Sequence, residues 1–249
     1  MVSYKTEAIV LRLREYREAD SLVTLLTRAR GKVTAVAKGV YKPASKLRGG
    51  AQPYSVNAMM LDQGRSSLHI LQQSECLEMM LPLRQSYEGM TLGAYWAELL
   101  ENFAQEEMAE DSLYFLAKAG FFGLSARADK LMCRALEIRL IQQQGLSPDF
   151  HACCRCGRKG TTGGFPAFSA GAGGFLCGDC GGAAADGIRV GAAAAGLWQG
   201  LENLALDKLD RLRAGPEQLD ELGRLLRRWI SQQAGKPMRT CPLLKKMEV

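Results

Sequence analysis

The run Leu22-Val23-Thr24-Leu25-Leu26-Thr27, followed by Lys32-Val33-Thr34-Ala35-Val36-Ala37-Lys38, determines the fold of the first part of the chain. Both runs favour extended backbone, and the second alternates small apolar side chains with mainly polar ones, which is the two-residue period of a strand. Residues 28–32 lie between them and carry Gly31 at the tip of a turn. The two runs therefore predict a β-hairpin.

Three further strands are expected around this hairpin. Ile9, Leu11 and Leu13 alternate with a valine and two arginines, which predicts a strand with one apolar and one increasingly basic face. Two more β-prone runs lie near 54–61 and 67–76. Five short strands in close succession fit a small Greek-key barrel, and the OB-fold is the leading candidate.

The spacing of apolar residues changes from that of strands to that of helices at Pro82. Apolar residues recur at helical spacing from 85 to about 122, from about 126 to 144, from about 192 to 206 and from 216 to 234. The sequence thus predicts an α+β multidomain protein, with an OB-fold barrel over residues 1–80, an α-helical domain over 81–150 plus 185–249, and a zinc-binding element over 151–184.

Two Cys-x-x-Cys pairs flank a glycine-rich interval in this last element. Their spacing is typical of a zinc site with four cysteine ligands, and four thiolates leave no open coordination position for catalysis. We therefore predict that a structural Zn²⁺ is bound by Cys153, Cys156, Cys177 and Cys180.

Other interpretations of the cysteines stay open. Disulfides need an oxidising compartment, and a redox Cys-x-x-Cys usually precedes a helix in a βαβ pattern, which this segment lacks. Cys154 is expected to be a spectator, and His151 an ordinary surface residue rather than a substitute ligand. Because residues 157–200 are rich in glycine, we expect them to bury little and to depend on a metal crosslink for order.

Positive charge is concentrated at the start of the chain. The net charge is +6, and residues 1–50 hold eleven Lys and Arg against four Asp and Glu. This pattern is typical of a polyanion-binding surface, although a solvated basic face would give the same composition. Residues 75–111 carry nine acidic residues, which we expect to form an exposed helix face away from nucleic acid. The basic run 224–246 either forms a second polyanion-binding surface or only places cations near a helix C-terminus, where they interact favourably with the helix dipole.

A basic loop with one aromatic ring follows the hairpin. OB-folds bind single strands through a basic groove and aromatic side chains that stack on bases. Alternatively, Tyr41 packs over the barrel edge and the neighbouring lysines keep the loop soluble. We predict phosphate contacts from the cations and base stacking by the ring, so the expected DNA-binding residues are Arg12, Arg14, Lys32, Lys38, Tyr41, Lys42, Lys46 and Arg48.

Motifs for catalysis are missing from the sequence. There is no Gly-x-Gly-x-x-Gly, no P-loop, no Gly-x-Ser-x-Gly and no His-Glu-x-x-His, and the chain has only two histidines. We therefore do not expect an enzyme. The first residues are charged, so a signal peptide is not expected, and no apolar run is long enough to span a bilayer. We therefore expect a cytoplasmic location.

Several stretches resemble the RecO family of bacterial DNA-repair and recombination mediators. They are residues 6–11, residues 20–39 with their Gly31-Lys32 turn, residues 45–53 and the paired Cys-x-x-Cys. The resemblance implies an OB-fold, a helical body and a zinc-bound element. It also implies binding of single- and double-stranded DNA, annealing of complementary strands at the nucleoid, and work with RecR. It further implies an interaction with single-stranded-DNA-binding protein, so that RecA can load onto the strands which that protein coats.

Two other classes of function stay open. The zinc element and helices could form a protein-interaction scaffold with incidental DNA binding, which a lack of DNA affinity at physiological salt would favour. The cysteine pairs could serve a thiol-redox enzyme, which quantitative zinc without reactive thiols would exclude.

Overall fold

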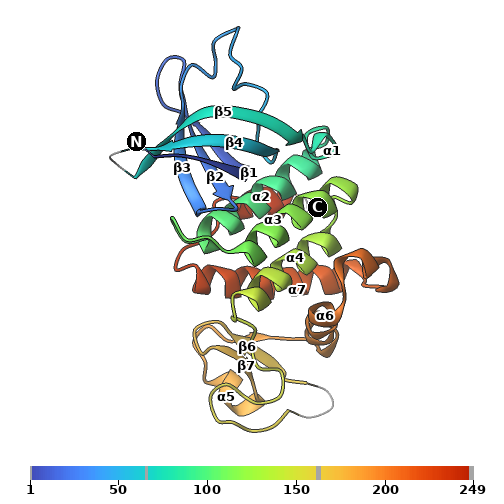
Figure 1. The fold of residues 1–249 in the computed structure, drawn as a ribbon. Helices are drawn as coiled ribbons and strands as arrows, with labels where there is room; N and C mark the ends of the chain where they lie inside the picture. The colour runs from blue at the N-terminus through green and yellow to red at the C-terminus, as the bar shows by residue number, and fades with distance from the viewer. Residues whose placement is uncertain (1, 65–66, 161–163, 247–249) are drawn as a thin grey trace. The chain divides into compact units, whose positions relative to one another are not determined.

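The computed structural model describes residues 2–64, 67–160 and 164–246. The chain divides into two compact units, Met1–Ala128 and Asp129–Val249. The first holds a barrel and three helices, and the second holds the other helices and a small sheet, which confirms the predicted α+β class (Figure 1). Strands give way to helices near residue 80, as expected, whereas the compact units divide after Ala128. Within the described residues, no helix is long and apolar enough to cross a membrane.

Five strands of the first unit close into a barrel in the order β1-β2-β3-β5-β4, the predicted OB-fold arrangement. Neighbouring strands are antiparallel except where β3 pairs with β5 and completes the ring. The bounds are β1 Val2–Glu15, β2 Ser21–Thr27, β3 Gly31–Ala37, β4 Val56–Gln63 and β5 Leu68–Glu78.

A β-bulge changes which face of β1 lies inside the barrel. The register shifts between Val10 and Arg12, so Leu13 joins Ala8 and Val10 in the interior cluster. The predicted apolar face of Ile9, Leu11 and Leu13 is therefore wrong. Ile9 and Leu11 are buried but do not belong to that cluster.

Three helices complete the first unit: α1 Leu81–Arg84, α2 Tyr87–Phe103 and α3 Asp111–Ala126. The predicted helical stretch from 85 to 122 is interrupted, because residues 104–110 form a linker. The indole of Trp96 in α2 donates to the carbonyl of Ala117 in α3 at 3.2 Å. Gly120 permits this approach, since a Cβ there would lie 2.4 Å from the indole nitrogen.

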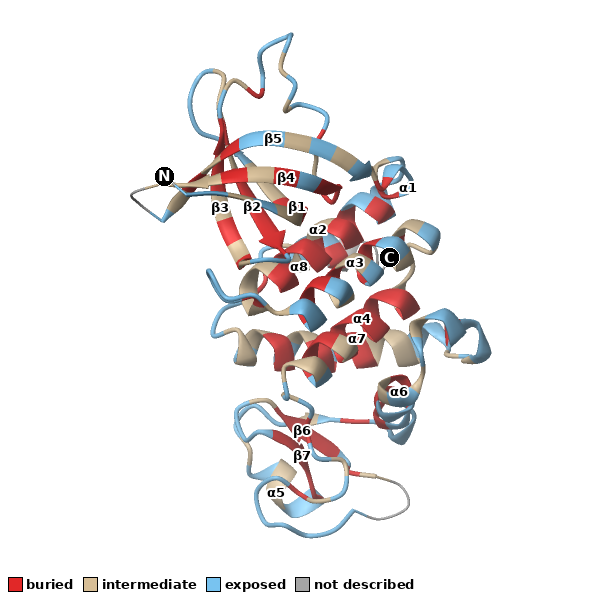
Figure 2. Cartoon of the chain, viewed as in Figure 1, coloured by how far each residue is buried: buried red, intermediate tan, exposed pale blue. Residues whose placement is uncertain are grey.

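The second unit has an aromatic core. Phe168 lies 5.1 Å from Phe175, 6.0 Å from Trp198 and 5.6 Å from Trp229, measured between ring centroids. All four rings are buried, and Figure 2 shows β6 and β7 coloured as buried, so the expectation that the glycine-rich segment buries little is wrong. The elements are α4 Lys130–Gln143, β6 Ala167–Ser169, β7 Gly174–Leu176, α5 Gly178–Gly182, β8 Ile188–Arg189, α6 Ala192–Asn203, a 3₁₀ helix Leu206–Arg211, α7 Pro216–Gln233 and α8 Cys241–Lys246.

Candidate metal centre and nucleic-acid interface

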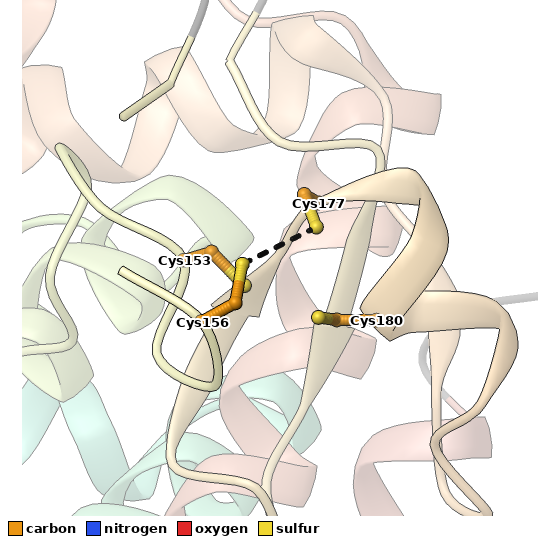
Figure 3. A group of neighbouring side chains, drawn as sticks. All are labelled: Cys153, Cys156, Cys177 and Cys180. Carbon is orange, nitrogen blue, oxygen red and sulfur yellow. Dashed lines mark hydrogen bonds between the residues drawn. The ribbon is translucent and has the colours of Figure 1, made fainter. Parts of the chain in front are cut away.

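The two cysteine pairs meet in space. The sulfur atoms of Cys153, Cys156, Cys177 and Cys180 all lie within 4.8 Å of one another (Figure 3). The Cys156 and Cys177 sulfurs are 3.8 Å apart, far beyond a disulfide bond. Four Zn–S bonds of about 2.3 Å in a tetrahedron place sulfurs about 3.8 Å apart, so the cluster fits a tetrahedral, thiolate-preferring metal ion.

Local backbone turns aim these sulfurs. Gly157 has φ +72° and follows the first pair, and its N–H donates to the Cys153 carbonyl at 2.9 Å. Cys177 stands at the N-cap of α5 and Cys180 lies inside that short helix. Burial raises the pKa of the Cys153 thiol, but backbone N–H groups from both pairs donate toward its sulfur and lower that pKa to about 6. These hydrogen bonds favour the thiolate of Cys153, the form that binds metal, whereas the neighbouring Cys177 sulfur raises the pKa of Cys180.

The two doubtful ligands lie outside the cluster. Cys154 is exposed, and its backbone N–H donates to the Phe175 carbonyl at 3.0 Å. His151 is also exposed, and its backbone N–H donates to Asp149 at 2.7 Å. Neither belongs to the group of potential ligands found among the described residues. None of the eight cysteines is in a disulfide bond.

One end of the barrel is held by the linker between α2 and α3. The backbone of Lys32 exchanges hydrogen bonds with Gln105 at 3.2 Å and Glu107 at 3.0 Å. Gly31 has φ +64°, and a Cβ there would lie 1.9 Å from the Met108 carbonyl oxygen, so only glycine fits. We call this end, formed by the β2–β3 turn and residues 101–111, the paired end.

Side chains at the paired end neutralise one another. The Lys32 ammonium also donates to the Glu101 carbonyl at 2.8 Å, and its side chain is only 15% exposed. Glu106, Glu107 and Asp111 are exposed as expected, although Glu106 and Glu107 lie in the linker rather than on a helix and all three contact cations of the barrel. The ion pairs at this end include Arg12–Glu101 at 3.5 Å, Arg28–Asp111 at 3.3 Å, Arg30–Glu107 at 3.3 Å and Lys32–Glu106 at 3.8 Å.

His69 completes this arrangement from β5, the strand in which it was expected. It is 1% exposed, and its Nδ1 lies 3.0 Å from the Tyr4 hydroxyl while its Nε2 contacts the Glu107 carboxylate. Burial first, and then the nearby Glu107 carboxylate, raise the pKa of Tyr4 to about 12. Because both ring nitrogens of His69 contact neighbouring side chains, we assign it a structural role in the barrel.

The opposite end of the barrel is formed by the β1–β2 loop and the long segment from β3 to β4, and we call it the open end (Figure 1). Asp20 accepts from the Gly39 N–H at 2.7 Å, and the Tyr41 N–H donates to the Ala19 carbonyl at 3.1 Å. The Arg48 guanidinium donates to the Tyr41 carbonyl at 2.8 Å. Backbone and side-chain hydrogen bonds therefore join the two loops.

Most predicted DNA-binding residues lie at the open end. Tyr41 is 45% exposed, and most of the segment that carries it faces solvent (Figure 2). The structure thus brings together one group of predicted residues at this end and places Arg12 and Lys32 in ion pairs with Glu101 and Glu106. Among the predicted DNA-binding cations, those that are exposed and make no ion pair within the described ranges are Arg14, Lys38, Lys42, Lys46 and Arg48.

Two neighbouring residues were missed by the sequence reasoning. Tyr16 is 40% exposed, and the Arg17 guanidinium lies 5.1 Å from its ring centroid. Both line a hollow that Tyr41 also lines. The available signal was the Tyr-Arg pair in a charged turn, but it gave no sign of proximity to Tyr41.

The basic run near the C-terminus lines a groove of the second unit. Arg224 and Arg228 of α7 lie there with Lys236, beside Asp186. The Asp186 carboxylate accepts from the Ser169 hydroxyl and the Gly171 N–H, which lowers its pKa.

The chain resembles known proteins along its whole length. Residues 1–80 match the family Recombination protein O N terminal, and residues 84–241 match Recombination protein O C terminal. DNA repair protein RecO of Moorella thermoacetica is 32% identical over 95% of this chain and 88% of its own. The RecO protein of Desulforudis audaxviator is 32% identical over 100% of this chain and 99% of its own. The RecO protein of Pelotomaculum thermopropionicum is 31% identical over 98% of this chain and 94% of its own. The chain therefore belongs to the RecO family of DNA repair proteins.

Proposed function

We propose that the chain is a non-enzymatic mediator of DNA repair and homologous recombination, acting in the cytoplasm at the nucleoid. It binds single- and double-stranded DNA and anneals complementary strands. With RecR it helps RecA to load onto strands coated with single-stranded-DNA-binding protein. Family membership supports the process, and the open end of the barrel supports the DNA contact.

The observation that carries this proposal is the group of exposed cations at the open end. Lys42, Lys46 and Arg48 form no ion pair within the described residues, so their charge is available to phosphates. Annealing needs no bond chemistry, because it requires only that two polyanions be neutralised and held close while bases pair. Each phosphate neutralised on a single strand adds about 0.7 to the salt slope of binding.

We assign a structural Zn²⁺ to the four cysteines. The supporting geometry is the group of sulfurs within 4.8 Å of one another, which fits four-coordinate thiolate ligation without an open position. Bound there, the ion would tie the loop before β6 to α5 and stabilise the second unit.

Strand annealing is the direct test. Complementary single strands coated with single-stranded-DNA-binding protein are mixed with the metal-loaded chain in the absence of nucleotide, and duplex formation is followed by fluorescence. We expect acceleration that fades as salt is raised. A folded, metal-loaded sample that gives no acceleration would contradict the proposal.

A protein-interaction scaffold is the second candidate function. The observation that favours it is the exposure of Leu77, Leu81 and Met90, whose side chains are 49%, 52% and 41% exposed near the start of the helices. A chain that acts only as a scaffold should show no DNA affinity at physiological salt. Salt-dependent DNA binding would leave the scaffold as an added property.

A further inference from the structure

A hollow of about 510 Å³ lies at the open end, between the two loops that hydrogen bonds join. It is lined by Glu15, Tyr16, Arg17 and Glu18 from the β1–β2 connection and by Tyr41 from the segment after β3. Two tyrosines from separate loops therefore face one space that is large enough for a flat ring.

The chain holds these rings in place without burying them. Tyr16 and Tyr41 are 40% and 45% exposed, so a ligand in the hollow can reach both side chains. The backbone of Tyr41 is fixed on both sides, by the Ala19 carbonyl at 3.1 Å and the Arg48 guanidinium at 2.8 Å. Arg17 already covers part of Tyr16, at 5.1 Å from the ring centroid.

Charge decides which part of a nucleic acid enters. The hollow is lined by the carboxylates of Glu15 and Glu18 and by the guanidinium of Arg17, so its lining is net negative and disfavours phosphate. The unpaired cations Lys42 and Lys46 lie on the adjoining segment and attract it. A single strand therefore fits with its phosphates along that segment and a base turned into the hollow.

We propose that this hollow is a nucleobase clamp, in which one unpaired base of single-stranded nucleic acid stacks against Tyr16 and Tyr41. The clamp rests on the proposed DNA-binding function and adds a means of telling single strands from duplex. Bases of a duplex are already stacked and paired, so they cannot enter without an unstacking cost of a few kcal/mol. The clamp releases its base when the complementary strand pairs with it.

Binding of defined strands by the full chain tests the clamp. The probes are an oligothymidylate of about 16 nucleotides and an abasic strand of the same length, which keeps every phosphate. We expect Tyr16→Ala and Tyr41→Ala each to weaken oligothymidylate binding roughly 5- to 150-fold, the range given by loss of one base–aromatic stack. Abasic binding should stay within twofold of that of the parent protein.

Matched variants separate stacking from folding. Tyr16→Phe and Tyr41→Phe keep the ring and should retain oligothymidylate binding. Tyr87→Ala removes another exposed tyrosine, 54% exposed at the start of α2, and should change nothing. A strand with 2-aminopurine at its centre should lose fluorescence on binding to the parent protein and to the Phe variants, but not to the Ala variants.

The outcomes distinguish this inference from the proposed function. If the parent protein binds neither strand, both fail. If it binds both strands and the Ala variants bind oligothymidylate normally, the clamp is overturned while the DNA-binding function stands. If the Ala variants instead lose binding of an oligoarginine peptide and keep that of DNA, the hollow receives a cationic protein side chain and the clamp is overturned.

Discussion

Both ends of the barrel carry several cations but use them differently. At the paired end, Arg30 and Lys32 form ion pairs with acidic residues of the linker between α2 and α3, and Arg28 forms one with Asp111 at the start of α3. At the open end, Lys42 and Lys46 make no ion pair within the described part of the chain. One set of charges holds helices onto a barrel, and the other is available to an outside polyanion.

This difference shows that basic residues clustered in one segment of the sequence need not form one basic surface in the fold. Residues 1–50 look uniformly basic, yet the acids that cancel part of their charge lie some sixty residues or more downstream in the chain, at Glu101 to Asp111. Charge already paired in the fold attracts phosphate weakly, since the neighbouring carboxylate repels it. The predictions below test this division, beginning with a change outside the barrel.

The largest effect is expected from a substitution in the second unit. It tests whether the difference between the two barrel ends is independent of the metal site. Cys177→Ser removes one of four thiolates and should abolish stoichiometric zinc, lowering the stability of the second unit by at least about 3 kcal/mol. Metal analysis and hydrogen exchange would measure this. Cys154→Ser is the control and should keep the metal. Retention of full zinc by Cys177→Ser would reject the assignment, and DNA affinity of the barrel should change little in either variant.

The next effect contrasts the two ends directly. Lys42→Glu with Lys46→Glu should weaken single-strand binding roughly 10- to 100-fold and reduce the salt slope by about 1.4, the value for two lost phosphate contacts. Arg28→Glu changes charge in the same direction at the paired end, beside Asp111. It should weaken binding no more than about threefold. Equal losses at both ends would remove the distinction between them.

A smaller effect is expected for Lys32, which was predicted to contact phosphate. Lys32→Met keeps the aliphatic stem but loses the bond to the Glu101 carbonyl, so unfolding free energy should fall by about 1 kcal/mol. Affinity for single strands should remain within about twofold. A large loss of affinity in a variant of unchanged stability would return Lys32 to the DNA-binding surface.

The smallest effect concerns acid stability at the paired end. Lys118 donates to Glu7 at 2.6 Å and lowers the pKa of that carboxyl below its ordinary value of 4.5. A depressed pKa stabilises the fold above the unfolded-state value, and this stability is lost as pH falls through the folded-state value. Lys118→Met should therefore flatten the stability profile between about pH 5 and pH 3, by less than about 1 kcal/mol because both groups are partly solvated. Parallel profiles for the two proteins would contradict this.

Much of the fold could be predicted because its signals are local. Strand alternation around Gly31 predicted the barrel, and Cys-x-x-Cys spacing predicted which four cysteines meet. The bulge at Val10 could not be predicted, because alternation assumes an unbroken register and a bulge depends on the partner strand. It moved Ile9 and Leu11 out of the barrel interior.

The rest depended on contacts between distant residues. The ion pairs of Arg12 and Lys32 join residues about seventy to ninety positions apart, and composition contains no distance information. The glycine content of residues 157–200 suggested little burial, because composition does not show that three of their aromatic rings, Phe168, Phe175 and Trp198, converge with Trp229. Tyr16 was overlooked because its link to Tyr41 exists only after the loops have joined.

The central claim is that single-stranded DNA binds at the open end and not at the paired end. Hydrogen exchange of the full, metal-loaded chain with and without oligothymidylate tests it most directly, because exchange reports each backbone segment separately. We predict added protection in residues 15–20 and 38–53, and none in residues 28–32 or 104–110. Protection confined to the paired end, or absent from residues 38–53 under saturating oligothymidylate, would contradict the account.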